Sequence, residues 1–143
     1  MFTCAAALTR IHHTEQPRVW GVGTNKALAQ ELAEHNLVQG GNLQISGLNG
    51  LLLGVAKERE IDGICLLGEV PAYTHRIQNP MAALAIINVL KEMLAIEINT
   101  DELAQYADEA RKQMKQVAAE AMEEYIDYFT EPIWEYGEDE ETE

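Results

Sequence analysis

The ionisable residues of this chain that could do chemistry follow a short apolar run near its middle. Glu69 comes just after the run Ile64–Leu67, and Tyr73 and His75 come soon after it. A carboxylate, a phenol and an imidazole could form an acid-base group if the fold brought them within hydrogen-bonding reach. In open parallel sheets, ligand crevices form at the carboxyl ends of strands, where Glu69 would lie. In the alternative interpretation, Glu69 caps a neighbouring loop and His75 makes an ordinary polar contact.

A glycine-rich segment, residues 46–50 (SGLNG), is the second candidate site. It precedes a predicted helix, whose free N–H groups and dipole could hold an anion or a small ligand. Neither GxxxxGK[ST] nor a complete GxGxxG is present, so a nucleotide loop is unsupported. The simpler interpretation is that these glycines allow a tight turn and close contact between helix and sheet. The candidate binding or contact residues are Gly47, Asn49, Gly50, Glu69 and Tyr73.

Other reactive residue types give no catalytic set. Ser46 lacks the first glycine of a nucleophile elbow and is better placed to cap a helix. His12 and His13 are adjacent, so on a strand they would point to opposite faces and would not share a metal. Cys4 and Cys65 form no CxxC pair, and we expect two reduced, mostly buried thiols. We therefore predict no catalytic residue, no metal site and no cofactor.

Two strands and a helix are predicted in the first part of the chain. Apolar and small residues alternate over Phe2–Leu8, which favours a strand, and the run Arg18–Thr24 reads as a second strand. Thr24 or Asn25 can cap a helix that runs to about His35. A strand followed by a helix is the expected order here.

The middle of the chain predicts a helix, a strand and another helix. The first helix runs from Ser46 through Ala56. The continuous apolar run Ile64–Leu67 is typical of a strand buried on both faces, which usually means a parallel sheet. Asn79 and Pro80 form a favourable helix start, and the helix that follows is apolar nearly all round until Lys91.

A long helix is predicted from Asn99 or Thr100 to about Phe129, roughly 44 Å at 1.5 Å per residue. A narrow apolar seam runs along it, with charged residues on the opposite side. Either the seam packs in the core over its whole length, or the far end reaches a partner subunit. The seam residues are Leu103, Ala107, Ala110, Met114, Val117 and Ala121.

Composition bounds the class of protein. The chain has 143 residues, 47% of them hydrophobic, which suits one globular domain with a real core. The formal net charge is -14, and an acidic balance opposes binding to nucleic acid and to anionic membranes. No apolar run reaches the roughly 18 residues that a membrane helix needs. We expect a cytoplasmic protein without nucleic-acid or membrane partners.

The predicted fold class is α/β, with three α/β/α layers, a mostly parallel sheet and a long C-terminal helix. Residues 1–130 are expected to form a single domain. Residues 131–143 are expected to form an acidic, flexible tail that contains no base. Its acids are Glu131, Glu135, Glu138, Asp139, Glu140, Glu141 and Glu143.

Three sequence blocks in this order resemble the proteasome assembly chaperone 2 family. They are residues 47–53 (GLNGLLL), 66–73 (LLGEVPAY) and 79–83 (NPMAA). The resemblance implies an α/β/α domain related in shape to nucleoside phosphorylases, in a family that is commonly oligomeric. Some of its members assist proteasome assembly. The resemblance covers only the second half of the family domain.

Two departures from the family shape the expected function. A half-length domain would leave sheet edges and apolar helix faces uncovered, so we expect the chain to associate with copies of itself. Archaeal members that grip the proteasome end in a hydrophobic-Tyr-any residue motif, whereas this sequence ends Glu141-Thr142-Glu143. We therefore do not expect the chain to dock into proteasome pockets by that route. The family blocks and the missing catalytic set lead us to expect a non-catalytic, assembly-chaperone-like module whose partners are itself and proteasome-related proteins. The alternative is a small-molecule enzyme or sensor that uses the glycine loop and Glu69.

Overall fold

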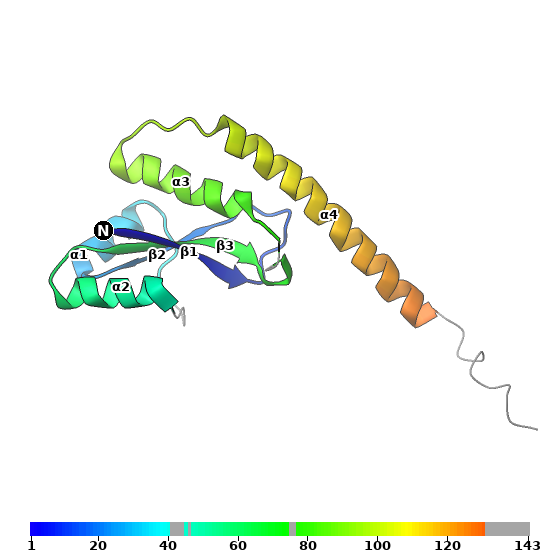
Figure 1. Cartoon of the computed structure of the whole chain (residues 1–143), viewed down its shortest axis with the longest axis horizontal. Helices are drawn as coiled ribbons and strands as arrows, with labels where there is room; N and C mark the ends of the chain where they lie inside the picture. Colours follow the sequence, from blue (N-terminus) through cyan, green and yellow to red (C-terminus); the bar gives the residue numbers. More distant parts are fainter. Residues whose placement is uncertain (41–44, 46, 75–76, 131–143) are drawn as a thin grey trace, which may run out of the picture.

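The computed structural model describes residues 1–40, 45, 47–74 and 77–130. The described residues form three strands, four α-helices and one turn of 3-10 helix (Figure 1). In chain order these are β1 (Phe2–Thr9), β2 (Val19–Gly23), α1 (Lys26–Glu34), α2 (Gly47–Glu58), β3 (Ile64–Pro71), η1 (Ala72–Thr74), α3 (Pro80–Leu94) and α4 (Asp101–Thr130).

The strands form one mixed sheet in the order β1-β3-β2. β1 runs parallel to β3, with Phe2 opposite Ile64, whereas β2 runs antiparallel to β3, with Val19 opposite Gly68. The prediction of a mostly parallel sheet is therefore wrong. All of β3 is buried because it is the central strand and has helices on both faces. Its apolar run therefore indicates a central strand, but it does not indicate whether the neighbouring strands are parallel to it.

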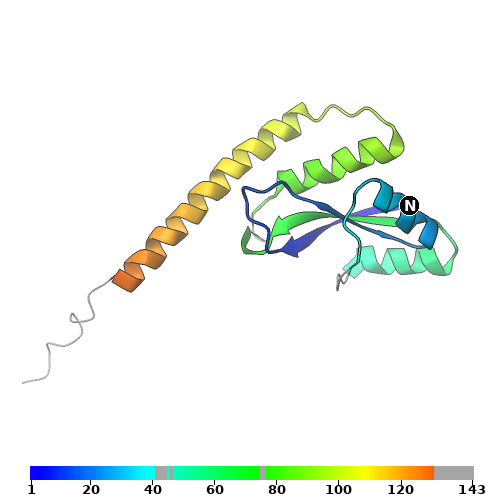
Figure 2. The same cartoon turned by 180° about the vertical axis from the view of Figure 1, so that it is seen from behind.

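Alternate side chains of β3 enter two separate apolar clusters. Ile64 and Leu66 pack with α1 and α3 on one face, whereas Cys65 and Leu67 pack with α2 on the other. Figures 1 and 2 show α3 and α2 on opposite sides of the sheet. The first cluster also holds Val19, Leu32, Leu37 and Ile86, and the second holds Ala7 and Leu53.

Local sequence signals explain where two helices begin. The side chain of Asn25 accepts a hydrogen bond from the Leu28 N–H at 3.0 Å and caps α1. The side chain of Asn79 does the same for the Ala82 N–H at 3.1 Å, with Pro80 at the first helical position of α3. Both predicted helix starts are confirmed. The predicted cap at Ser46 lies outside the described residues.

Helix α4 packs on α3 for only the first half of its length. Ala107 and Met114 are buried against Met81, and Ala110 is buried as well. Beyond Met114 the helix projects past the sheet, as Figures 1 and 2 show. None of the described helices is both long enough and apolar enough to cross a membrane.

Candidate functional site

Glu69 is a fully buried carboxylate that ties β3 to the loop between β1 and β2. Its Oε1 accepts hydrogen bonds from Thr9 Oγ1 at 2.9 Å and from Arg18 Nη2 at 2.9 Å. Its Oε2 accepts from Arg18 Nε at 3.0 Å and from the Arg18 backbone N–H at 3.1 Å. Thr9 ends β1 and Arg18 precedes β2, so one side chain fixes both ends of the loop.

These contacts decide what Glu69 can do. Hydrogen bonds from Arg18 hold the pKa of Glu69 below its usual value of 4.5, against the opposing effect of burial. Because both oxygens already accept two hydrogen bonds each, Glu69 is a poor proton acceptor at neutral pH. A cavity of about 430 Å3 lies beside it and is lined mainly by polar side chains of the loop, including Arg10, Glu15 and Gln16. The geometry favours the loop-capping interpretation.

Tyr73 pairs with His13, a partner that the sequence did not suggest. Tyr73 Oη lies 2.9 Å from both the backbone nitrogen and Nδ1 of His13. The backbone N–H donates to the hydroxyl, and the hydroxyl and the Nδ1 of the ring form a second hydrogen bond. Burial, followed by the charges of His12 and Lys115, lowers the pKa of His13 below 6.5. His75 lies outside the described residues.

The two adjacent histidines do not point to opposite faces as expected. β1 ends at Thr9, so His12 and His13 lie in the loop, and their ring centroids are 4.1 Å apart. No group of three or more metal-binding side chains was found within the described ranges. Cys65 is buried as predicted, but Cys4 is exposed on β1, so the prediction of two buried thiols is wrong for Cys4.

The glycine-rich segment is used to seat α2 beside β1. Asn49 Nδ2 donates to the Cys4 carbonyl at 3.1 Å. Gly47 has a positive φ of 70°, and a Cβ at Gly50 would lie 2.2 Å from the Ile45 carbonyl oxygen. Both glycines are therefore required by the backbone.

The five predicted site residues do not converge on one pocket. Asn49 contacts β1 at Cys4, which pairs with Leu66 of β3. Glu69 lies three residues further along β3, about 10 Å away along the strand. Tyr73 follows in η1, at the same end of the sheet as Glu69. The structure thus groups Glu69 with Tyr73 at one end and Gly47, Asn49 and Gly50 at the start of α2.

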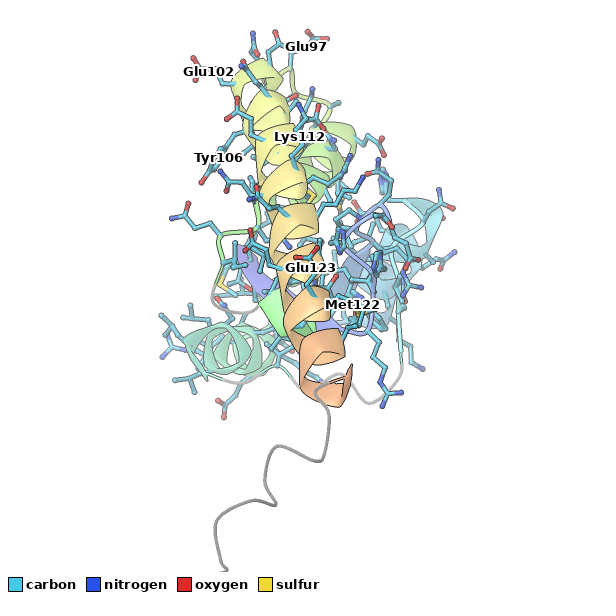
Figure 3. The ribbon with its side chains drawn as sticks, turned by 90° about the vertical axis from the view of Figure 1, so that its right-hand side faces the viewer. Glu97, Glu102, Tyr106, Lys112, Met122 and Glu123 are labelled. Atoms are coloured by element: carbon cyan, nitrogen blue, oxygen red, sulfur yellow. The ribbon has the colours of Figure 1, made fainter. Side chains whose placement is uncertain are left out.

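Of two exposed apolar surfaces, the first was not identified from the sequence, whereas the second lies on the predicted long helix, whose far end was considered as a partner contact. The first, here called the α2 stripe, consists of Leu48, Leu51, Leu52 and Val55, of which Leu48 and Leu51 are 68% and 65% exposed. Their i, i+3, i+4, i+7 spacing is the available signal. The second is the projecting part of α4, where Val117 and Met122 are 50% and 64% exposed. Figure 3 shows Met122 near the far end of this helix.

The model of the PAC2 family matches residues 1–118. That match ends in α4, close to where this helix leaves the rest of the domain. Among curated proteins, an uncharacterised protein of Methanocaldococcus jannaschii is 40% identical over 96 residues, which is 65% of this chain and 35% of that protein.

Solved structures of several organisms share the fold. A PAC2 family protein of Streptomyces avermitilis has a TM-score of 0.72 at 26% identity, over 87% of this chain and 52% of that one. Pyrococcus furiosus PbaB, described as an archaeal proteasome activator, has a TM-score of 0.68 at 26% identity, over 82% and 50%.

Pyrococcus furiosus PbaA is described as an archaeal homolog of proteasome-assembly chaperone. Its TM-score is 0.66 at 24% identity, over 90% of this chain and 52% of that one. At this identity the likeness concerns the fold. The present chain spans about half the length of these solved relatives and about a third of the curated one.

Proposed function

This chain belongs to the PAC2 family, and we propose that it is a non-catalytic, oligomeric protein-binding module with a chaperone-like role. The proposed partners are further copies of the chain and proteasome-related proteins. The descriptions of PbaA as a homolog of a proteasome-assembly chaperone and of PbaB as a proteasome activator support this class of partner. A protein that assists assembly works by contact, so it needs exposed apolar surface more than a reacting group.

The projecting part of α4 is the observation that carries the proposal. The apolar seam of α4 packs on α3 as far as Met114, which is 2% exposed. Val117 continues the same seam but is 50% exposed, and Met122 is 64% exposed. Large apolar side chains on a highly charged helix that projects from the rest of the domain suit the grooves of a protein partner.

The small-molecule alternative has less support because its residues are already engaged. Both oxygens of Glu69 are occupied by Thr9 and Arg18. The Asn49 amide donates to Cys4. The two halves of the suggested pocket also lie at different points along the sheet.

Three finer features complete the proposal. Residues 1–130 form the single domain, and the acidic residues 131–143 lie outside it. The three-layer α/β/α arrangement is proposed for this domain, with α1 and α3 on one face of the sheet and α2 on the other. The cytoplasm, where proteasome-related partners occur, is the proposed location.

The test is binding to purified proteasome particles and to their unassembled subunits. Immobilised chain should retain one of these, and Val117→Glu should reduce the retained amount at least tenfold, since a buried carboxylate is costly in an apolar contact. Ala119→Glu is the matched control, because Ala119 is also exposed on α4 but lies off the seam. The proposed partner class is wrong if neither particle nor subunit is retained. The proposed surface is wrong if both variants bind like the original chain.

A further inference from the structure

Among the described residues, the outer edge of β1 pairs with no other strand, and one of its outward groups, the Cys4 carbonyl, accepts a side-chain hydrogen bond from Asn49. The Ile64 N–H donates to the Met1 carbonyl at 2.9 Å, which fixes the pattern of the parallel ladder. Odd-numbered residues of β1 therefore turn their N–H and C=O groups toward β3, and even-numbered residues turn theirs outward. The outward-turned residues are Phe2, Cys4, Ala6 and Leu8.

The opposite edge of the sheet, formed by β2, is covered by another segment of the chain. The Gly21 N–H donates to the Val38 carbonyl at 3.0 Å, and the Val38 N–H donates to Val19 at 2.9 Å, so this segment covers β2. The β1 sequence FTCAAALT contains neither a charged residue nor proline, the devices that usually protect an exposed edge. In a chain of net charge -14, this uncharged edge is a place where two copies can approach.

Apolar side chains flank this edge on both faces. Leu8 is 60% exposed and Phe2 is 41% exposed. Beside them, between β1 and α3, lies a groove of about 380 Å3 that Ile77 and Ala83 help to line. On the other face, helix α2 lies against β1, where its Asn49 bonds to Cys4, and the α2 stripe is exposed on this helix. Backbone pairing and apolar burial would thus occur together.

We propose that β1 pairs antiparallel with β1 of a second copy about a two-fold axis, which continues the sheet through six strands and brings the two α2 stripes together. This inference rests on the self-association in the proposed function and names its surface. A two-fold axis perpendicular to the sheet keeps both α2 helices on the same face. The edge is then complementary to itself.

The spacing of strands and helices fits this arrangement. α2 contacts both β1 and β3, so its axis lies near the boundary between them. With strands about 4.8 Å apart, the axes of α2 and its symmetry mate would be roughly 9.6 Å apart. Packed helices lie about 8–10 Å apart. The two α2 stripes would therefore meet at an ordinary helix-packing distance.

The strand register and the buried area also fit a pairing of two β1 strands. The register that uses all four outward residues places Phe2 opposite Leu8 of the second copy and Cys4 opposite its Ala6. The Cys4 carbonyl, which already accepts from Asn49, would take the ladder hydrogen bond on its second lone pair. An eight-residue strand is about 26 Å long, and with a helix layer of about 10 Å on each face the contact is about 30 Å deep. The resulting area of about 800 Å2 per copy is that of a standard stable interface.

The first test measures mass by light scattering at roughly 100 μM chain, which would populate a dimer of micromolar dissociation constant. The original chain should show at least twice 16.0 kDa. Leu51→Glu and Ala6→Pro should each return the mass to 16.0 kDa with an unchanged helical signal. Leu51 lies near the start of α2, where an acid is favourable, and the Ala6 N–H faces outward, so proline removes no internal ladder bond. Ile96→Glu, at another exposed apolar residue, is the control that should change nothing.

The second test checks the register by disulfide formation. In Ala6→Cys, the new thiol should oxidise with Cys4 of the second copy to give a dimer that resists denaturant, because such opposed residues have Cα atoms about 5.5 Å apart. Ala27→Cys, on exposed α1 at the other edge, should not cross-link. Cross-linking of both variants alike, or of neither, would overturn the register.

The outcomes separate this inference from the proposed function. An oligomer that persists in both Leu51→Glu and Ala6→Pro refutes the β1 pairing while leaving self-association intact. A strictly monomeric original chain refutes both the pairing and self-association. If the edge variants lose binding to a different protein without any change in mass, that protein and not a second copy occupies the edge.

Discussion

The Glu69 carboxylate holds together two segments that are far apart in the sequence. It receives hydrogen bonds from Thr9 and Arg18, 60 and 51 residues away. Arg18 keeps much of its side chain in solvent, 62% exposed, while Glu69 is 1% exposed. Only the Glu69 partner of this ion pair is therefore buried, which limits the desolvation cost of the pair.

We expect Glu69→Gln to lower the free energy of unfolding by about 2 kcal/mol, because a charged acceptor is lost and one oxygen is replaced by a donor facing donors. Urea unfolding at a fixed chain concentration measures the change. Glu58→Gln, at an exposed residue, is the control and should alter stability by less than about 0.5 kcal/mol. Equal stability of the two variants would contradict the structural role of Glu69.

The buried imidazole of His13 predicts a loss of stability in mild acid. Its pKa is lower in the folded protein than the ordinary value of 6.5, so the unfolded chain binds more protons just below that pH. Stability should fall as pH drops from about 6.5 toward the folded pKa of His13. Glu69, whose pKa is also lowered, adds a second loss only below about 4.5.

Urea unfolding between pH 7 and pH 5 would measure the first of these losses. His13→Gln should flatten the pH dependence in that window and leave the loss below pH 4.5 unchanged. His35→Gln, at a histidine in the C-cap of α1, is the matched control. An unchanged slope in His13→Gln would show that another group titrates there.

At the scale of elements, the contact between β3 and α3 depends on Gly68. A Cβ at this position would lie 2.7 Å from the Ala82 carbonyl oxygen and 3.0 Å from the Ala82 Cβ. The strand and the helix backbone therefore pack closely on this face. Gly54, in the exposed part of α2, has no heavy atom within 4 Å of an added Cβ.

We expect Gly68→Ala to lower the free energy of unfolding by about 2–3 kcal/mol, because the crowded backbone atoms must shift. Gly54→Ala is the matched variant and should raise it by about 0.5–1 kcal/mol through helix propensity. Urea unfolding of the two variants measures both values. A similar effect of the two would mean that α3 does not sit this close to β3.

Local signals predicted the elements better than their arrangement. Asn25 and Asn79-Pro80 act within a few residues, so their helix starts were predictable. The direction of β2 depends on how the loop before Arg18 turns, and no residue in that loop encodes it alone. The partners of Glu69 and Tyr73 were hidden for the same reason, since Thr9 and His13 lie 60 residues away from them.

At the scale of the whole molecule, α4 divides into a packed half and a projecting half. We expect a chain that ends at Ala118 to keep its free energy of unfolding within about 0.5 kcal/mol, because Met122 and Ile126, the large apolar side chains described beyond that point, are 64% and 53% exposed. A chain that ends at Ala110 loses Met114, which is 2% exposed, and should be about 2–4 kcal/mol less stable. Urea unfolding tests the pair, and comparable losses in both would show that the projecting half is part of the folded core.

The projecting half of α4 also has a mechanical consequence. From Lys115 to Thr130 it extends about 24 Å as a single stiff rod. A tilt of roughly 5° where it leaves α3 would sweep its tip through about 2 Å. In a two-fold pair of copies, the two projecting helices would stand on either side of a gap. The length of the helices and the position of the two-fold axis would set the width of this gap. Partner proteins would then be selected by their width before any side chain is recognised.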